Sequence, residues 1–271
     1  MKIKSAVTWP VSVLATYDAL VSRLRPSLDG IVRGHAVSRF FTTERKAVYN
    51  GITLTFSCPT QVAAYRARTF ASKEPETLEW LDGLSGVFWD VGANVGLYSI
   101  YFAKRHNVRA FAFEPSVFNL ELLARNIHRN GADVAVMPFA LFSATKVDVL
   151  RMSTMEHAGA LSSFGVDYGW EGTKLAVDFE YSTLGISVDD AVALGIPAPN
   201  HLKIDVDGVE HEILAGAKGA LRSVSSVLVE LNDRFAEQAV TARRLLSEAG
   251  LALARDVREG DGTHNEIWRR H

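Results

Sequence analysis

A turn punctuated by glycine carries the clearest chemical signal in this sequence. Residues 88–98 read Phe-Trp-Asp-Val-Gly-Ala-Asn-Val-Gly-Leu-Tyr, with Asp90 before the turn and Gly92 and Gly96 inside it. Glycine lets the backbone approach a ligand closely, and the free amides of a following helix bind anions. Glu114 ends the next expected strand, where a carboxylate can accept both hydroxyls of a ribose. The pattern therefore predicts a site for a nucleoside-type ligand.

Two enzyme classes use such a turn, the NAD-dependent oxidoreductases and the S-adenosylmethionine (SAM) methyltransferases. The dinucleotide fingerprint has glycines where this chain has Asn94 and Leu97. The pattern Asp-x-Gly-Ala-Asn-x-Gly instead resembles the first motif of class I methyltransferases. An NAD-dependent oxidoreductase and a non-catalytic SAM-binding protein remain the alternatives, as does a turn that needs glycine for packing alone.

Acidic residues are expected at the carboxyl ends of four strands. They are Asp90, Glu114, Asp205 and Glu230. SAM carries a positive sulfonium and an ammonium group, and nearby anions favour both charges. The competing explanation is that buried acids at strand ends accept hydrogen bonds from loop amides.

The residues after the fourth of these strands could supply a base. Asp207 and Glu210 have the spacing of a capping box at a helix start, and His211 follows in the first turn. An ordinary histidine pKa near ~6.5 suits proton acceptance at neutral pH. We therefore predict His211 as the catalytic base and Asp205 as the residue that orients cofactor or acceptor. A surface role for His211, and a metal held by the neighbouring acids, are the alternatives; no metal is predicted.

Segments of strand and helix alternate around these residues. Strands are expected at 87–91, 109–114, 134–141, 201–206, 226–231, 251–257 and 265–270, with helical patterns between most of them. No helical pattern separates the last two, so they should form an antiparallel hairpin. We predict an α/β, Rossmann-like class I methyltransferase fold: a mostly parallel seven-stranded sheet with an antiparallel last strand, and ligands at the carboxyl ends of the strands.

The chain divides into an N-terminal cap and a larger body. The cap, residues 1–82, is expected to contain an amphipathic helix docked on the body, a β-hairpin at Asn50-Gly51 and a helix that opens at Glu74-Pro75. The SAM-binding methyltransferase domain covers residues 83–271, with an insertion at about 145–185. That insertion should hold two extra strands, and its aromatic residues Phe164, Tyr168 and Trp170 could contact an acceptor.

Five motifs together resemble the FkbM family of SAM-dependent O-methyltransferases. They are residues 73–80, 90–96, 113–115, 203–210 and 229–232. The resemblance covers about residues 66–233 and implies methylation of a hydroxyl on a sugar, a polysaccharide precursor or a natural product. The cofactor site that we expect comprises Glu74, Asp90, Gly92, Ala93, Asn94, Gly96, Tyr98, Glu114, Pro115, Asn119, Ala140, Leu141 and Asp205. Ala140 and Leu141 would flank the adenine.

Composition narrows the remaining function classes. The 271 residues carry a net charge of −2 with no basic block, which disfavours nucleic-acid binding. Cys58 is the single cysteine, so the sequence has no internal disulfide and no Cys-rich zinc site. No apolar run is long enough for stable membrane insertion, and Trp9-Pro10 interrupts the only segment like a signal peptide. We expect a cytoplasmic enzyme with a small-molecule or glycan acceptor, and leave homo-oligomer formation open.

Overall fold

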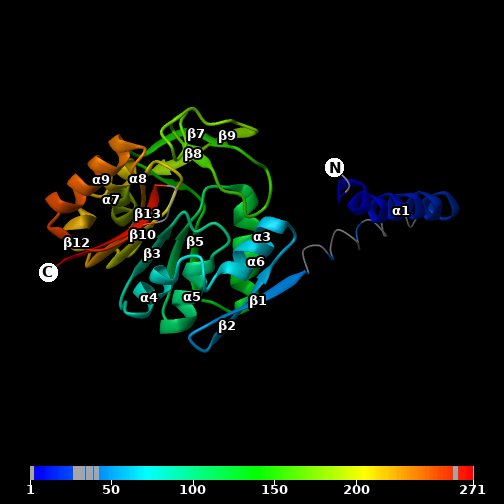
Figure 1. Cartoon of the computed structure of the whole chain (residues 1–271), viewed down its shortest axis with the longest axis horizontal. Coiled ribbons are helices and arrows are strands. Elements are labelled where there is room, and N and C mark those ends of the chain that lie inside the picture. Colours follow the sequence, from blue (N-terminus) through cyan, green and yellow to red (C-terminus); the bar gives the residue numbers. More distant parts are fainter. Residues whose placement is uncertain (1–2, 27–33, 35–38, 40–42, 259–261, 271) are drawn as a thin grey trace.

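A seven-stranded sheet forms the centre of this computed structural model, which describes residues 3–26, 34, 39, 43–258 and 262–270 (Figure 1). Its strand order is β12-β13-β11-β10-β3-β4-β5. The pairs among β5, β4, β3, β10 and β11 are parallel, whereas β13 runs antiparallel to both of its neighbours. The predicted fold class is confirmed. The strands are β3 (Phe88–Val91), β4 (Ala110–Phe113), β5 (Val134–Met137), β10 (His201–Ile204), β11 (Ser226–Asn232), β12 (Leu251–Arg258) and β13 (Thr263–Arg270).

Helices cover both faces of this sheet because neighbouring strand residues point to opposite sides. On β3, Phe88 packs in one hydrophobic core with Tyr101 and Phe102, while Trp89 packs in another with Ile213 and Leu246. The first core lies under α4 (Pro75–Asp82), α5 (Leu97–His106) and α6 (Val117–Asn130), and the second lies under α7 (Val188–Ala193), α8 (Glu210–Ala215) and α9 (Ala236–Glu248).

The predicted hairpin is present as β1 (Glu44–Tyr49) and β2 (Ile52–Ser57), followed by α3 (Gln61–Thr69). Its turn residues Asn50 and Gly51 both have positive φ. Helix α6 binds the free edge of β2 through asparagine side chains. Asn126 accepts from the amide of Ser57 at 2.8 Å and donates to the carbonyl of Val95 at 2.9 Å, and Asn130 bonds both backbone groups of Thr55. The hairpin is thereby fastened to the body.

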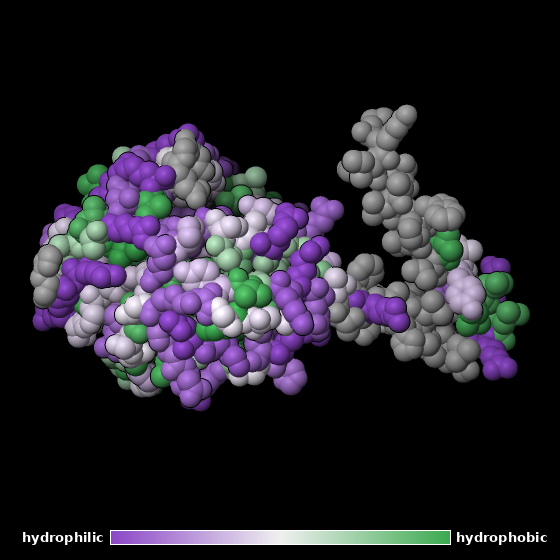
Figure 2. Space-filling model, turned by 60° about the horizontal axis from the view of Figure 1, so that its bottom comes forward, coloured by the Kyte–Doolittle hydropathy of each residue, from purple (hydrophilic) through white to green (hydrophobic). Residues whose placement is uncertain are grey.

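The N-terminal helix α1 (Ile3–Leu24) differs from expectation. Figure 1 shows it apart from the sheet and its helices. The apolar residues that should have packed on the body are exposed: Val13 by 49%, Tyr17 by 58% and Leu20 by 55%. Figure 2 shows hydrophobic residues gathered on this helix. The expectation of docking was wrong, because helical spacing indicates an apolar face without indicating what covers it. No helix within residues 3–26, 43–258 and 262–270 combines the length and the apolar character needed to cross a membrane.

The insertion forms a second sheet above the strand ends, with the order β6-β9-β7-β8. The expected strand over residues 134–141 is divided, because residues 140–141 leave the main sheet and pair with β9 instead. The insertion contains three strands where two were expected. The elements of this sheet are β6 (Ala140–Leu141), β7 (Lys146–Met152), β8 (Ser162–Phe164) and β9 (Phe179–Ile186).

The expected helix over residues 209–221 is likewise interrupted. It consists of α8 and a short 3-10 helix at Ala220–Arg222.

We expect Asn126→Leu to destabilise the protein by about 2–4 kcal/mol. The near-isosteric leucine leaves the buried amide of Ser57 and the carbonyl of Val95 without partners, and each such group costs about 1–3 kcal/mol. Urea unfolding measures the change. His128→Ala, on an exposed position of the same helix, should stay within about 0.5 kcal/mol. Equal stability of the two variants would show that the asparagine does not fasten the hairpin.

Candidate active site

The glycine-rich turn joins β3 to α5 at the carboxyl edge of the main sheet. Gly92, Asn94 and Gly96 have φ values of 81°, 50° and 84°. A Cβ at Gly92 would lie 1.9 Å from the carbonyl oxygen of Asp205, so a larger residue cannot occupy this position. Packing of the turn against the end of β10 therefore requires glycine, in addition to any ligand that the turn binds.

Asp90 lies at the end of β3 and lines neither of the two cavities described below. Its side chain is buried, and Oδ2 accepts a hydrogen bond from the amide of Ser99 at 2.9 Å in the first turn of α5. The N-cap residue of α5 is Gly96, which has no side chain for this purpose, so Asp90 caps the helix from the neighbouring strand. Burial raises the pKa of Asp90 to about 6, although the nearby Lys203 ammonium opposes the shift.

Glu114 follows β4 and holds two backbone amides. Oε2 accepts from the amide of Asn94 and Oε1 from that of Ser116, both at 2.8 Å. Burial raises the pKa of Glu114 to about 7 despite these bonds. Acceptance from loop amides, which was the competing explanation, is thus observed, and the same carboxylate also borders a cavity.

This first cavity, of about 690 Å³, has a polar and an apolar side. Of the expected cofactor residues, Gly92, Asn94, Glu114, Pro115, Asn119, Ala140, Leu141 and Asp205 line it. Phe139 and Phe164 extend the apolar wall around Ala140 and Leu141. Phe164, expected near an acceptor, belongs instead to this cavity.

A second cavity of about 700 Å³ lies beside the first and shares part of its wall with it, including Asp205 and Asp207. The expected residues Glu74, Gly92, Ala93, Asn94, Tyr98 and Asp205 line it, together with Arg66, Lys73, Lys203 and Glu230. Glu74 is held in place by the Tyr98 hydroxyl, which donates to Oε2 at 2.9 Å, and by Lys73 at 3.0 Å. Gly96 lines neither cavity, so its part in the site is the start of α5.

A buried lysine provides the central charge beneath these cavities. Lys203 is 1% exposed, and its Nζ lies 2.7 Å from Oδ2 of Asp205 and 4.9 Å from the centre of the Tyr98 ring. Burial alone would lower the pKa of Lys203, but the carboxylates of Asp205, Glu74 and Asp90 outweigh it and raise the pKa. The same ammonium holds the pKa of Asp205 below its ordinary value, against the effect of burial.

A loop of the insertion covers the place where the two cavities meet. The carbonyl oxygen of Gly159 accepts from Nδ2 of Asn94 at 2.8 Å and from Nδ2 of Asn119 at 3.2 Å. Nε of Arg66 donates to the carbonyl of Ala158 at 2.8 Å, and the amide of Leu161 donates to Asp207 at 2.7 Å. The covering loop, residues 157–161, is therefore fastened by the side chains that line the cavities.

The expected base, His211, lies away from both cavities. Its ring is 7% exposed and packs edge-on against Phe235, with 5.8 Å between ring centroids. Burial lowers the pKa of His211. Its catalytic role stays a prediction that this geometry does not favour. Tyr168 also packs on Phe235, at 5.2 Å, so this aromatic residue of the insertion contacts α9's start.

The capping box expected at residues 207–210 is wrong. Val209 occupies the N-cap position, and Asp207 uses its carboxylate for the amide of Leu161 in the covering loop. Glu210 reaches back to the amides of Val206 and Gly208, which is one half of the expected arrangement. Asp207 thus bonds the amide of Leu161, which is distant in sequence, in place of an amide in the first turn of α8.

Sequence reasoning did not include Lys203 and Arg66 among the site residues. The signal for Lys203 was a lysine inside the apolar strand His-Leu-Lys-Ile, two residues before an aspartate and therefore on the same strand face. Arg66 carried no comparable signal, because its partner, the Ala158 carbonyl, lies far along the chain.

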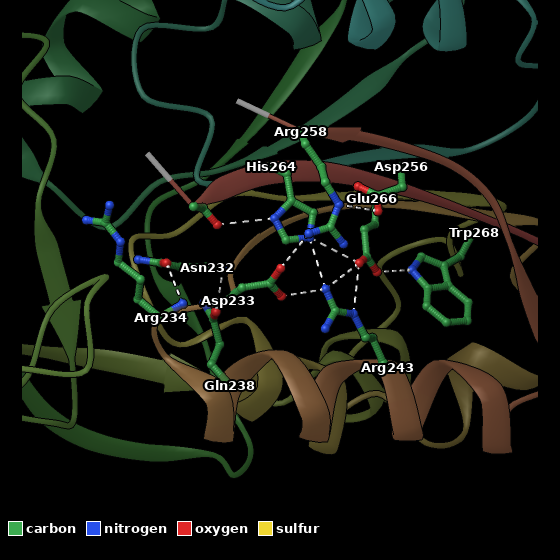
Figure 3. A network of polar contacts seen from close by, with 11 residues as sticks. Asn232, Asp233, Arg234, Gln238, Arg243, Asp256, Arg258, His264, Glu266 and Trp268 are labelled. Carbon is green, nitrogen blue, oxygen red and sulfur yellow. Dashed lines mark hydrogen bonds and ion pairs between the residues drawn. The ribbon is translucent and has the colours of Figure 1, made fainter. Parts of the chain in front are cut away.

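A group of charged side chains on β12 and β13 has the spacing of metal ligands but already contains cations (Figure 3). Ligand atoms of Asp256, His264 and Glu266 lie within 4.8 Å of one another. Arg243 donates to Glu266 at 2.8 Å and lies 3.0 Å from Nε2 of His264, while Arg258 donates to Asp256 at 2.8 Å. Guanidinium groups thus neutralise these carboxylates, and the group is an ion-pair network.

Comparison with known proteins identifies the family. The FkbM methyltransferase domain matches residues 90–253. The chain is 34% identical over 168 residues to the hexuronic acid methyltransferase AglP of Haloferax volcanii, covering 61% of this chain and 63% of that protein. It is 28% identical over 172 residues to the 31-O-demethyl-FK506 methyltransferase FkbM of Streptomyces tacrolimicus, covering 54% of this chain and 65% of that protein.

Each of these alignments spans less than two thirds of the relative's own length. A crystal structure of the methyltransferase FkbM from Methylobacillus flagellatus is 15% identical, with a TM-score of 0.47 over 69% of this chain and 45% of that one. The domain match covers more than half of the sequence. The chain therefore belongs to the FkbM methyltransferase family.

Proposed function

We propose that this protein is a SAM-dependent methyltransferase that methylates a hydroxyl group of a sugar or of a sugar-bearing precursor. The observation that carries the proposal is the position of Glu114, a buried carboxylate at the border of a cavity that also has an apolar slot. Family membership supports methyl transfer, and the name of the hexuronic acid methyltransferase supports a sugar acceptor.

The polar groups at the first cavity fit the cofactor. The side-chain oxygens of Asn94 and Asn119 have no hydrogen-bond partner among the residues that the structure describes, and both residues line this cavity. The adenine amino group and the ribose hydroxyls of SAM can donate hydrogen bonds to such oxygens. Glu114 would bind the ribose, and the slot beside Ala140 and Leu141 would hold the adenine.

The second cavity would take the methionyl part of SAM and the acceptor. Glu74 and Asp205 supply negative charge there, and the cofactor's ammonium and sulfonium groups are positive. When bound, SAM supplies an electrophilic methyl group. The tasks of the protein are to align the acceptor oxygen, exclude water and remove the hydroxyl proton. The covering loop would provide the water exclusion.

Recognition of an acidic sugar would use the cations of the second cavity. Arg66 and Lys73 both line it, and either could bind a carboxylate of the acceptor. A screen with labelled SAM should therefore include methyl glycosides of glucuronic acid and of glucose, together with a macrocyclic alcohol. Transfer to a sugar hydroxyl supports the proposal, whereas transfer only to the macrocyclic alcohol would refute the sugar assignment.

We expect Glu114→Ala to weaken SAM binding by roughly ten- to a hundredfold. Hydrogen bonds to a charged group contribute about 1.5–3 kcal/mol, and the variant loses both oxygens that would accept the ribose hydroxyls. Isothermal titration calorimetry with SAM measures the change, with NAD as a comparison ligand. Glu248→Ala, an exposed acid on α9, serves as the control. Unchanged affinity in a folded Glu114→Ala protein would remove the carboxylate from the site.

We also expect the affinity for S-adenosylhomocysteine (SAH), which lacks the sulfonium charge, to rise about tenfold between pH 6 and pH 8. Glu114 has a pKa of about 7, so its ionised fraction rises about tenfold over this range. The ionised form accepts hydroxyl hydrogen bonds more strongly, so binding favours loss of the proton. Glu114→Gln should remove most of this pH dependence. Calorimetry at fixed ionic strength tests it, and an affinity that falls with pH would contradict it.

A further inference from the structure

Glu230 stands where the second cavity meets a smaller opening at the edge of the sheet. This opening, of about 220 Å³, is lined by Lys73, Glu74, Glu230, Thr263, His264 and Asn265. Lys73, Glu74 and Glu230 line the second cavity as well. A ligand that reaches from the opening into the second cavity would therefore pass the carboxylate of Glu230.

The pairing of the strands turns Glu230 toward the reacting region. In the parallel register of β10 and β11, Lys203 pairs with Leu228 and Ile204 with Val229. The next step aligns Asp205 with Glu230. Side chains that are level in neighbouring strands point to the same face, so Glu230 and Asp205 share the cavity face of the sheet.

Glu230 also differs from the other carboxylates of the second cavity in its lack of hydrogen-bond and ion-pair partners among the described residues. Glu74 accepts from Tyr98 and Lys73, Asp205 is paired with Lys203, and Asp207 accepts from the covering loop. The carboxylate of Glu230 makes no hydrogen bond and no ion pair with any residue that the structure describes. A base needs a free oxygen to receive a proton. Glu74, Asp205 and Asp207 each have at least one oxygen engaged, whereas in the described part of the chain both oxygens of Glu230 are free of partners.

We propose that Glu230 is the general base that removes the proton of the acceptor hydroxyl. This inference rests on the proposed function. The acceptor O–H bond gives its proton to Glu230, the oxygen forms a bond to the methyl carbon, and the sulfur keeps the electron pair of the broken C–S bond. The carboxylate and the sulfonium are charged before the step, and both groups are neutral after it. A site that is poor in water favours such a cancellation of charge.

The charges around Glu230 explain how it can be a base at neutral pH. Burial and the carboxylates of Asp205 and Glu74 raise the pKa of Glu230, so the ligand-free protein favours its protonated form more than it would for an ordinary carboxyl group. The titratable groups that face it are Lys73, Glu74, Tyr98, Lys203, Asp205, Asp207, Glu210 and His264. A sulfonium in the second cavity adds a positive charge and favours the ionised form. Cofactor binding would thus generate the base.

Proton release on binding provides a test that does not depend on an acceptor. Titration of the full chain with SAM and with SAH, in buffers of different ionisation enthalpy at pH 7, counts the protons released. Release caused by Glu114 is common to both ligands, whereas release from Glu230 requires the sulfonium. We expect SAM to release up to about one proton more than SAH, and Glu230→Gln to abolish this difference while SAH still binds. Glu237→Gln, an exposed acid nearby, should behave like the wild type.

Kinetics complete the test with any sugar that the acceptor screen identifies. Glu230→Gln should lower kcat by ~10²–10⁴, and Glu230→Asp, which keeps a carboxylate, should recover part of it. Equal proton counts for SAM and SAH in the wild type, or full turnover in Glu230→Gln, would overturn the assignment. A wild type that binds neither SAM nor SAH would instead refute the proposed function, which a changed proton count alone cannot do.

Discussion

The ion pair between the buried Lys203 and the partly exposed Asp205 is the interaction on which the site depends. One ammonium at the floor of the cavities faces the carboxylates of Asp205, Glu74 and Asp90. Removing one partner of such a pair leaves an uncompensated buried charge, which costs about 3–5 kcal/mol. The pair also decides which acid is free to react, because a carboxylate fixed by an ammonium is a poor proton acceptor. Glu230, on the neighbouring strand β11, is not fixed by an ammonium group in this way.

The directions of the strands could be predicted from patterns that are short in range. Apolar segments separated by helical sequence patterns indicate parallel strands, and the lack of a helical sequence pattern between the last two segments predicts the reversal of β13. The incorrect predictions concern which other part of the chain a helix or strand packs against. The apolar spacing of α1 does not specify a partner, and residues 140–141 belong to a second sheet because β9, more than 40 residues later, pairs with them.

For the site, the sequence likewise indicated which residues lie near the cavities but not which partners their side chains contact. The glycine turn, the apolar pair Ala140 and Leu141, and three of the strand-end acids (Glu114, Asp205 and Glu230) do border the cavities, whereas Asp90 caps α5 instead. The engagement of each acid depends on partners that are remote in sequence. Asp207 matched a local capping pattern, yet Leu161 of the covering loop takes its carboxylate. His211 had a suitable chemical type, but packing against Phe235 places it away from the cavities.

The reversed direction of β13 separates two parts of the protein that can diverge independently. A parallel strand presents its last residues at the ligand-binding edge, whereas β13 presents its first residues, Thr263, His264 and Asn265, at the smaller opening. These residues of β13 lie outside residues 90–253, the range that matches the family's domain. Substitutions at the start of β13 can therefore change the rim of the smaller opening without changing any residue that lines the first cavity. Such a separation would let the proposed acceptor site vary while the proposed cofactor site stays the same.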